Sequence, residues 1–290
     1  MITSPTAPWE SVLIPENEDG QAWELFHENS KTSRFERGLS DEEVLLRMAT
    51  LSSSLPHSGY KEFGLPPPLL LDAPMGETMK RRATARGLQP CKITPEQLTT
   101  LLFYSYGETR ATEGAGARPL RVVPSAGALY PLEIYFHSSH IEGWPSGLYH
   151  YTPSNNKVQL LREGYYSQQL SQAMVDPKMI LNSAIQFFIT GLFERSVFKY
   201  RERGYRFVLL EAGHAAQNLN LVATALGFGL INIGGFFDRE VDAVLGLDGL
   251  GHSTIYLQVM GIDDAGPVED KMVAEPARRR KKEEAERASQ

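Results

Sequence analysis

The stretch PSAGALYPLEIY, residues 124–135, joins a run of small residues to an apolar segment. Between Pro124 and Pro131 the small residues let the backbone approach a flat ligand closely. Ser125 and the amides that follow it can hydrogen-bond the polar edge of a ring. A plain turn is the alternative, and the stretch alone favours it. Residues 132–137 (LEIYFH) are typical of a strand, so the stretch leads directly into the predicted sheet.

Strands and helices alternate irregularly on both sides of this stretch. Further strands are predicted at 147–151, 157–161, 186–190 and 253–260. Thr94, Pro95 and Gln97 form a helix start with a capping box, because threonine caps and Pro95 takes the first helical position. Residues 206–226 are apolar nearly all round, which predicts a central helix or one at a subunit interface. A short helix is expected at 238–245 and a loop at 107–119. The fold class is α+β, with helices around one sheet.

Composition excludes several classes of protein. The chain has 290 residues, 42% of them hydrophobic, and a formal net charge of −6. This is ordinary globular composition, and the charge argues against nucleic acid as the main partner. There is no run of 18 apolar residues and no pattern of a signal peptide, so we expect neither a membrane span nor secretion. A single cysteine, Cys91, rules out an internal disulfide and fits a cytoplasmic protein.

Three regions are expected along the chain. Residues 1–74 are predicted to form an N-terminal arm and a helical extension, in which Ser40 caps a helix with an acidic first turn. Five prolines within 56–76 indicate an extended connector. Residues 75–265 are expected to form the main domain. The charged tail, 266–290, is expected to be a solvated helix or disordered.

Three further motifs carry side chains suited to a cofactor site. Arginines flank Thr84 in KRRATARGL (80–88), and guanidinium forks with a hydroxyl suit a phosphate, although a solvated basic patch is the alternative. Tyr200 follows Lys199, and nearby positive charge lowers the pKa of a phenol; the alternative is an exposed helix entry. Gly234 and Gly235 follow a short apolar strand and present backbone amides. Their spacing does not match the dinucleotide fingerprint, and His137 with His140 lacks further ligands for a metal site.

In this order and spacing, the segments PSAGALYPLEIY, KYRERGYRFVLLEAGHAAQNL and GFGLINIGGFFD resemble the nitroreductase-like flavoprotein superfamily. Within it the chain is similar to the SagB-type dehydrogenases, FMN-dependent azoline oxidases that act in the biosynthesis of thiazole- and oxazole-containing peptides. The resemblance covers residues 75–262, and residues 22–70 look like the helical extension of this subfamily. It implies a central, mostly antiparallel sheet flanked by helices, and a homodimer with two FMN sites at the subunit interface.

The resemblance also implies roles for particular residues. The phosphate element corresponds to Arg82, Thr84 and Arg86, and the flavin-lining segment, usually from the other subunit, to Arg121, Pro124, Ser125, Ala126, Gly127 and Leu129. Gly234 and Gly235 match the backbone near the flavin N5 and O4. MGIDDAG (260–266) stands where many nitroreductases have a C-terminal phosphate contact, so the N-terminal arginines must suffice. Lys199 and Tyr200 match a Lys-Tyr pair linked to catalysis. Adjacent residues of a helix point different ways, which hinders direct coupling if this segment is helical.

The expected function is oxidation of a thiazoline or oxazoline to the azole, with O2 as the electron acceptor. Tyr200 is the expected base and Lys199 its activator. The expected partners are a second copy of the chain, an azoline-containing peptide or carrier-bound substrate, and a cyclodehydratase complex. Three alternatives remain open: an NAD(P)H-dependent nitro- or quinone reductase, a dehydrogenase of another amino-acid-derived bond, and a flavin-less scaffold subunit.

Overall fold

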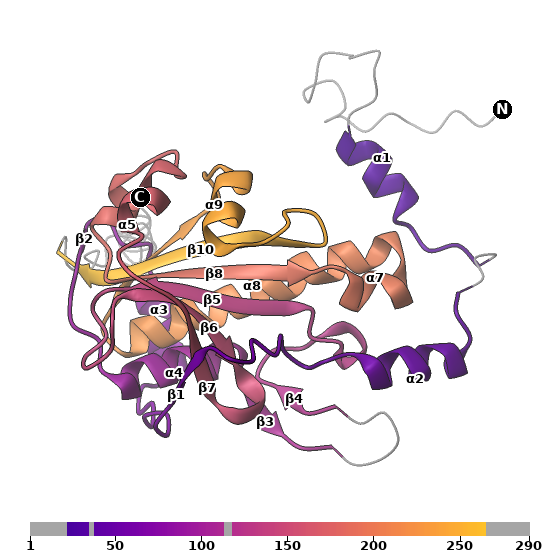
Figure 1. The fold of residues 1–290 in the computed structure, drawn as a ribbon, viewed down its shortest axis with the longest axis horizontal. Helices are drawn as coiled ribbons and strands as arrows, with labels where there is room; N and C mark the ends of the chain where they lie inside the picture. Colours follow the sequence, from indigo (N-terminus) through magenta and orange to yellow (C-terminus); the bar gives the residue numbers. More distant parts are fainter. Residues whose placement is uncertain (1–21, 35–37, 113–117, 265–290) are drawn as a thin grey trace, which may run out of the picture.

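The computed structural model describes residues 22–34, 38–112 and 118–264. Its main feature is an antiparallel sheet with the order β1-β7-β6-β5-β8-β10-β2, in which β9 also pairs with β10 (Figure 1). The strands are β1 (Lys61–Gly64), β2 (Leu88–Gln89), β5 (Leu132–Ser138), β6 (Gly147–Thr152), β7 (Lys157–Glu163), β8 (Ile185–Leu192), β9 (Gly229–Ile233) and β10 (His252–Asp263). The α+β fold with a mostly antiparallel sheet is therefore confirmed.

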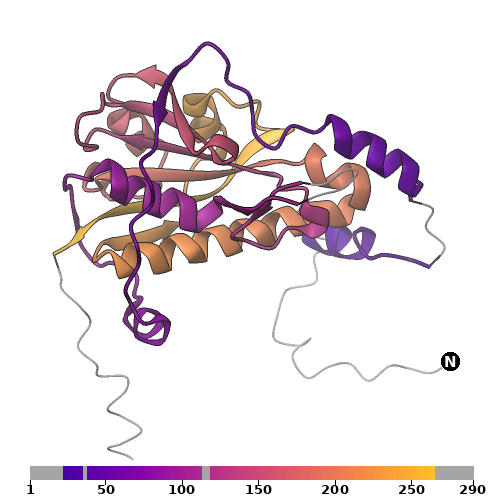
Figure 2. The ribbon, with the colours of Figure 1, turned by 90° about the horizontal axis from the view of Figure 1, so that it is seen from below.

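Helices cover both faces of this sheet. The helices of the described residues are α1 (Ala22–Asn29), α2 (Asp41–Thr50), α3 (Met75–Arg81), α4 (Pro95–Tyr106), α5 (Ser167–Gln172), α6 (Lys178–Leu181), α7 (Glu194–Tyr200), α8 (Glu202–Ala225) and α9 (Asp238–Leu245). Of these, α1 and α2 belong to the N-terminal extension and lie beyond the end of the sheet (Figure 1). One apolar cluster joins the sheet to α4 and α8, and a second joins its other face to α5, α6 and α9. Figures 1 and 2 show these layers, with the long α8 running beneath the sheet.

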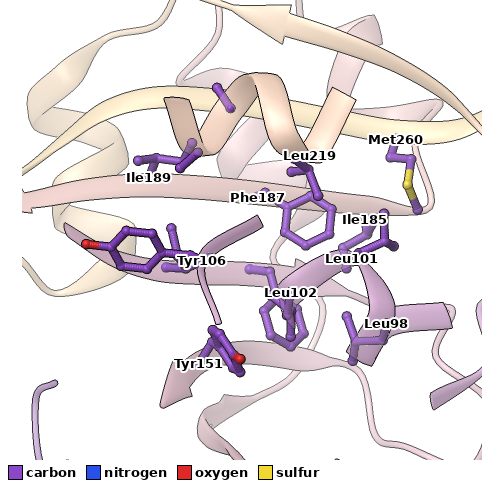
Figure 3. Packing of buried hydrophobic residues seen from close by; sticks show 14 of the residues in the cluster. Leu98, Leu101, Leu102, Tyr106, Tyr151, Ile185, Phe187, Ile189, Leu219 and Met260 are labelled. Atoms are coloured by element: carbon purple, nitrogen blue, oxygen red, sulfur yellow. The ribbon is translucent and has the colours of Figure 1, made fainter. Parts of the chain in front are cut away.

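The larger cluster forms the centre of the molecule. Figure 3 shows side chains of α4 and α8 packed against the middle strands. Leu98, Leu101 and Leu102 of α4 are fully buried against Phe187 of β8. Burying each such side chain contributes roughly 1.5–3 kcal/mol. This rigid core fixes the ends of β5, α7 and α8, where the predicted site residues lie.

The helix starts agree with the local chemistry of the sequence. Ser40 and Glu43 form a capping box at α2, and Thr94 and Gln97 form another at α4, with Pro95 in the first turn. The short helix at 238–245 is confirmed. The long predicted helix begins at Glu202, four residues earlier than expected, because α7 and α8 follow each other almost without a break.

Two predictions of irregular structure were wrong in part. Residues 108–110, placed in a loop, form β3 (Glu108–Arg110), which pairs with β4 (Leu120–Arg121). Residues 61–64, placed in the proline-rich connector, form β1 and pair with β7. Both strands are short and polar, so they lack the apolar pattern that predicts a strand. The charged tail, 266–290, and residues 1–21 lie outside the described residues, and the region boundaries at 74 and 265 stay predictions.

The N-terminal extension contacts the junction of α7 and α8. Arg206 of α8 donates from Nε to Ser30 Oγ (2.8 Å) and from Nη2 to the His27 carbonyl (2.5 Å). The rings of Phe26 and Tyr205 meet edge to face at 5.4 Å. The extension therefore lies beside the segment that carries the Lys-Tyr pair.

Candidate active site

The structure brings the Lys-Tyr pair against the small-residue loop. A Cβ atom placed on Gly127 would lie 2.7 Å from Tyr200 Oη and 3.0 Å from Lys199 Nζ. Such contacts are shorter than real Cβ atoms make, and Gly127 has φ +63°, so only glycine fits here without strain. The polar ends of both side chains therefore meet the backbone of this loop.

The expectation that a helix would separate Lys199 from Tyr200 does not hold here. Both residues lie in α7, but Tyr200 is its last residue and Arg201 follows with φ +51° and ψ −140°. At this end Lys199 Nζ lies 5.3 Å from the centroid of the Tyr200 ring. A cation over an aromatic face is attracted to it, so the two side chains contact each other at this end of α7.

The loop itself holds an uncommon backbone conformation. Ala128 and Tyr130 have φ +51° and +47°, close to the left-handed value of Gly127. Non-glycine residues in this region carry roughly 1–3 kcal/mol of strain each. Tyr130 N donates to Ser125 Oγ (2.9 Å), and Arg121 N donates to Tyr130 Oη (3.0 Å). These two hydrogen bonds hold the loop in this conformation.

A buried carboxyl group lies beneath the loop. Glu211 of α8 is 2% exposed, and its Oε1 accepts a hydrogen bond of 2.6 Å from Tyr106 Oη. Burial raises the pKa of Glu211 to about 7, against the opposing effect of hydrogen bonds from Ser125 and Tyr106. Glu211 was missed in the sequence analysis. The available signal was an acidic residue within the apolar face of a long helix, since such residues are rarely buried without a partner.

Some predicted site residues point into the protein. Leu129 is fully buried, and Arg121 is 5% exposed. The Arg121 guanidinium lies 4.4 Å and 4.9 Å from the ring centroids of Tyr106 and Tyr130, and its Nη2 donates to the Ser53 carbonyl (2.6 Å). Pro124 is exposed at the surface of the loop, with Ser125 and Ala126 half-buried beside it. The exposed part of the loop therefore includes Pro124, while Arg121 is buried beneath it.

The predicted phosphate element lies along β9. Thr84 forms a parallel bridge with Leu230, and Ala85 N donates to the Leu230 carbonyl (3.0 Å). Arg86 and Thr84 are exposed and Arg82 is half-buried. Where the family's C-terminal contact would stand, Asp263 Oδ1 accepts from Gly87 N (3.3 Å). The basic side chains of this element are thus available to a ligand beside β9.

The paired glycines end the same strand. Gly234 and Gly235 are exposed, and a Cβ atom on Gly234 would meet nothing within 4 Å. The Gly235 carbonyl accepts a hydrogen bond from Val175 N (3.0 Å). A flat ligand could therefore approach the backbone at Gly234, four residues along β9 from the phosphate element.

The phosphate element and the small-residue loop lie at different ends of the sheet, whereas Gly234 follows Ile233, which is level with Phe188 and therefore nearer the loop. Thr84 is level with Leu230, and through β10 with Ile185 at the start of β8. The small-residue loop leads into Leu132, which is paired with Gly191 near the end of β8. Six residues of strand separate these levels, about 20 Å. One chain thus presents two half-sites: the phosphate half-site (Arg82, Thr84, Arg86, Gly234 and Gly235) and the Lys-Tyr half-site (residues 124–130 with Lys199 and Tyr200).

A polar cavity opens beside Tyr200. Its volume is about 310 Å³, and it is lined by residues 29–32 of the extension and 200–203 of the α7–α8 junction. A molecule in this cavity would lie beside Tyr200. In the described residues no group of three His, Cys, Asp or Glu side chains is placed to hold a metal ion. The same residues contain no helix that is long and apolar enough to cross a membrane.

With this fold and these half-sites in view, the chain belongs to the nitroreductase family, a family of oxidoreductases, whose model matches residues 79–262. A putative nitroreductase from Methanocaldococcus jannaschii, MJ1384, is 33% identical over 169 residues, which are 58% of this chain and 82% of that protein. The microcin B17-processing protein McbC of Escherichia coli is 31% identical over 147 residues, 49% of this chain and 54% of McbC.

One more relative and one solved structure align with only part of their own length. The trifolitoxin-processing protein TfxB of Rhizobium leguminosarum is 28% identical over 55% of this chain, but this covers only 44% of TfxB. The chain thus spans about half the length of McbC and of TfxB. Among solved structures, a putative nitroreductase from Anabaena variabilis aligns with a TM-score of 0.67 at 23% identity, over 86% of this chain and 49% of that one. This alignment supports the fold.

Proposed function

We propose that the chain is an FMN-dependent oxidase that converts thiazoline or oxazoline rings of a peptide to thiazole or oxazole. The observation that carries the proposal is the convergence of Lys199 Nζ and Tyr200 Oη on Gly127. The reaction removes a hydride and a proton from the ring. Bound FMN would accept the hydride, and O2 would then take the two electrons and become hydrogen peroxide. The protein must accept the proton, which is the role of the Lys-Tyr pair.

Tyr200 is the proposed base and Lys199 the group that favours its ionised form. A phenolate is stabilised by a cation beside it, and Lys199 Nζ lies over the Tyr200 ring, 5.3 Å from its centroid. The polar cavity beside Tyr200 gives the peptide a path to this base. The names of McbC and TfxB as microcin B17- and trifolitoxin-processing proteins support the proposal of a peptide substrate. We include a cyclodehydratase complex among the proposed partners.

The phosphate half-site fits one end of FMN. Arg82, Thr84 and Arg86 would hold the phosphate with two guanidinium groups and a hydroxyl. The open backbone at Gly234 and Gly235 would lie against the isoalloxazine ring. Along the strands, the small-residue loop of the same chain lies about 20 Å from the phosphate element.

We therefore propose a homodimer in which each active site combines one half-site from each chain. The outer face of α8 supports this arrangement, because Leu209 and Leu210 are 40% and 59% exposed. An apolar cavity of about 320 Å³ lies between α8 and the segment before α3, and Leu71 and Leu221 are part of its lining. Exposed apolar surface of this kind is typical of subunit interfaces.

The oxidase is tested by an anaerobic visible spectrum of the FMN-loaded protein. Addition of an azoline peptide should bleach the flavin, and Tyr200→Phe should slow this step by about 10²-fold or more with FMN still bound. Tyr205→Phe is the matched control, since Tyr205 lies five residues further along, in α8, and its ring packs against Phe26 and Phe193. Equal rates for Tyr200→Phe and the wild type would remove Tyr200 from the mechanism.

The shared site is tested by mixing two inactive variants. Arg82→Ala should lose FMN, and Tyr200→Phe should retain it but fail to transfer the proton. In a refolded 1:1 mixture, each mixed dimer carries one site with both defects and one site with neither, so about a quarter of the wild-type activity should return. A mixture that stays inactive while mixed dimers form would place each site within one chain.

One alternative function is supported by the comparison with MJ1384. That protein is named as a putative nitroreductase, and the alignment covers most of its length. Bleaching of the flavin by NADPH, with no response to the azoline, would make this chain a reductase. Protein that cannot be loaded with FMN would instead point to a scaffold subunit.

A further inference from the structure

A short segment of the N-terminal extension contacts buried residues on both sides of the Lys-Tyr half-site. We call this segment, residues 51–55, the strap. It follows α2 directly and crosses beside two buried arginines of the β3–β4 hairpin region. Arg118 Nη1 donates to the Leu51 carbonyl (3.4 Å), and Arg121 Nη2 donates to the Ser53 carbonyl (2.6 Å). The strap thus provides acceptors for both guanidinium groups.

Those acceptors matter because the arginines are buried. Arg118 and Arg121 are 9% and 5% exposed, and Nε and Nη2 of Arg118 and Nε of Arg121 have no hydrogen-bond partner in the described part of the chain. Buried cations without acceptors are costly. Losing the strap carbonyls would leave Arg121 held mainly by the rings of Tyr106 and Tyr130. Arg121 comes just before the small-residue loop, so the hydrogen bond from Arg121 to the strap also holds the start of that loop.

The other end of the strap reaches the helix of the Lys-Tyr pair. Ser54 Oγ and Leu55 N each donate to the carboxylate of Glu133 at 3.0 Å. The same carboxylate forms an ion pair of 2.6 Å with Arg195, which is 5% exposed. Arg195 lies one turn before Lys199 in α7, and its Nη1 also donates to the Tyr130 carbonyl at 3.4 Å.

From these contacts we propose that the strap is a positioning element of the active site. It holds the small-residue loop through Arg121 and holds α7 through Glu133 and Arg195, so it fixes Gly127 relative to Lys199 and Tyr200. Its catalytic consequence rests on the proposed function of the Lys-Tyr pair. Its structural consequence, restraint of α7 and of the loop, is independent of the reaction.

Hydrogen–deuterium exchange of the full-length, FMN-loaded protein tests this restraint without substrate. Ser54→Ala removes one donor to Glu133 and should speed exchange in peptides covering 124–131 and 194–201. Ser58→Ala is the matched control, because Ser58 is exposed in the same segment of the extension. Faster exchange in the strap alone, with both site peptides unchanged, would overturn the proposal. Arg195→Lys provides a second variant, which keeps the charge but loses the guanidinium fork and should affect 194–201 most.

Kinetics then separate positioning from simple stability. Ser54→Ala should lower the rate of substrate-driven flavin reduction by about three- to tenfold, with unchanged FMN content and unchanged KM. A lower melting temperature with a normal rate for the folded flavoprotein would mean that the strap only stabilises the fold. If no azoline reduces the wild-type flavin, the proposed function fails, while the exchange experiment still decides the role of the strap.

Discussion

Two buried glutamates on opposite sides of the sheet differ in how readily they lose their proton. Glu133 projects from β5 toward the strap, and Glu211 projects from α8 beneath the small-residue loop; both are 2% exposed. Glu133 accepts from Arg195, His150, Ser54 and Leu55. Glu211 accepts from a phenol and a serine hydroxyl, with no ion pair among the described residues. Although the two carboxyl groups are equally buried, their pKa values differ, because their hydrogen-bond donors differ.

The pKa values follow from those donors. Burial raises the pKa of Glu133, but the hydrogen bond and charge of His150, together with Arg195 and Arg121, overcome it and lower the pKa to about 2. At Glu211 burial prevails and the pKa rises to about 7. A buried carboxyl group stays ionised when cations donate to it and tends to hold its proton when only neutral hydroxyls do. Glu133 thus acts as a fixed anchor, while Glu211 titrates near neutral pH.

The largest expected effect comes from neutralising the anchor. Glu133→Gln should destabilise the protein by about 3–5 kcal/mol, because it leaves Arg195 buried without its counter-ion. Denaturant unfolding measures the free energy. Glu142→Gln, on an exposed glutamate, is the control and should change little. A loss below about 1 kcal/mol for Glu133→Gln would mean that the Glu133–Arg195 pair adds little to the fold.

The two glutamates should affect stability in opposite pH ranges. Between its ordinary pKa of 4.5 and about 7, folded Glu211 holds a proton that the unfolded chain has released, so stability falls as the pH rises. The loss from this group is about 3 kcal/mol and levels off above pH 7. Glu133 behaves in the reverse way: its contribution is present above pH 4.5 and is lost as the pH falls toward 2.

The variant Glu211→Gln isolates the first of these ranges. Unfolding free energies measured from pH 5 to 8 should decline for the wild type and for the control Glu240→Gln, whose residue is exposed on α9. For Glu211→Gln the decline should disappear. A slope that persists in this variant would assign the pH dependence to other groups.

Local sequence chemistry predicted the frame of this molecule but not these two networks. The capping residues of α2 and α4 and the strands around Leu132 follow from patterns within a few residues, and the structure has them. Glu133 and Arg195 are 62 positions apart, and Glu211 and Tyr106 are 105 apart. No short pattern relates such residues, because only the sheet order and the packing of α4 on α8 bring them together. For the same reason, the Lys-Tyr pair and the small-residue loop were predicted from the family resemblance and not from a short pattern.

The smallest expected change in stability comes from removing the Tyr106 hydroxyl, the phenol that donates to Glu211. Tyr106 Oη donates to Glu211 and accepts from Leu132 N (3.2 Å), the first amide of β5. Tyr106→Phe leaves that buried amide without its partner, so we expect a loss of about 1–2 kcal/mol. It also removes a hydrogen bond that lowers the pKa of Glu211, and the pH at which stability declines should move upward.

The control for this variant is Tyr104→Phe, on the same helix but half-buried and packed against Phe103. It should leave both the stability and the midpoint of the pH profile unchanged. If Tyr106→Phe lowers the stability but leaves the midpoint in place, the phenol supports β5 alone. A midpoint that moves would instead establish that a neutral donor tunes the protonation of Glu211, and with it the hydrogen bond that Ser125 of the small-residue loop donates to Glu211.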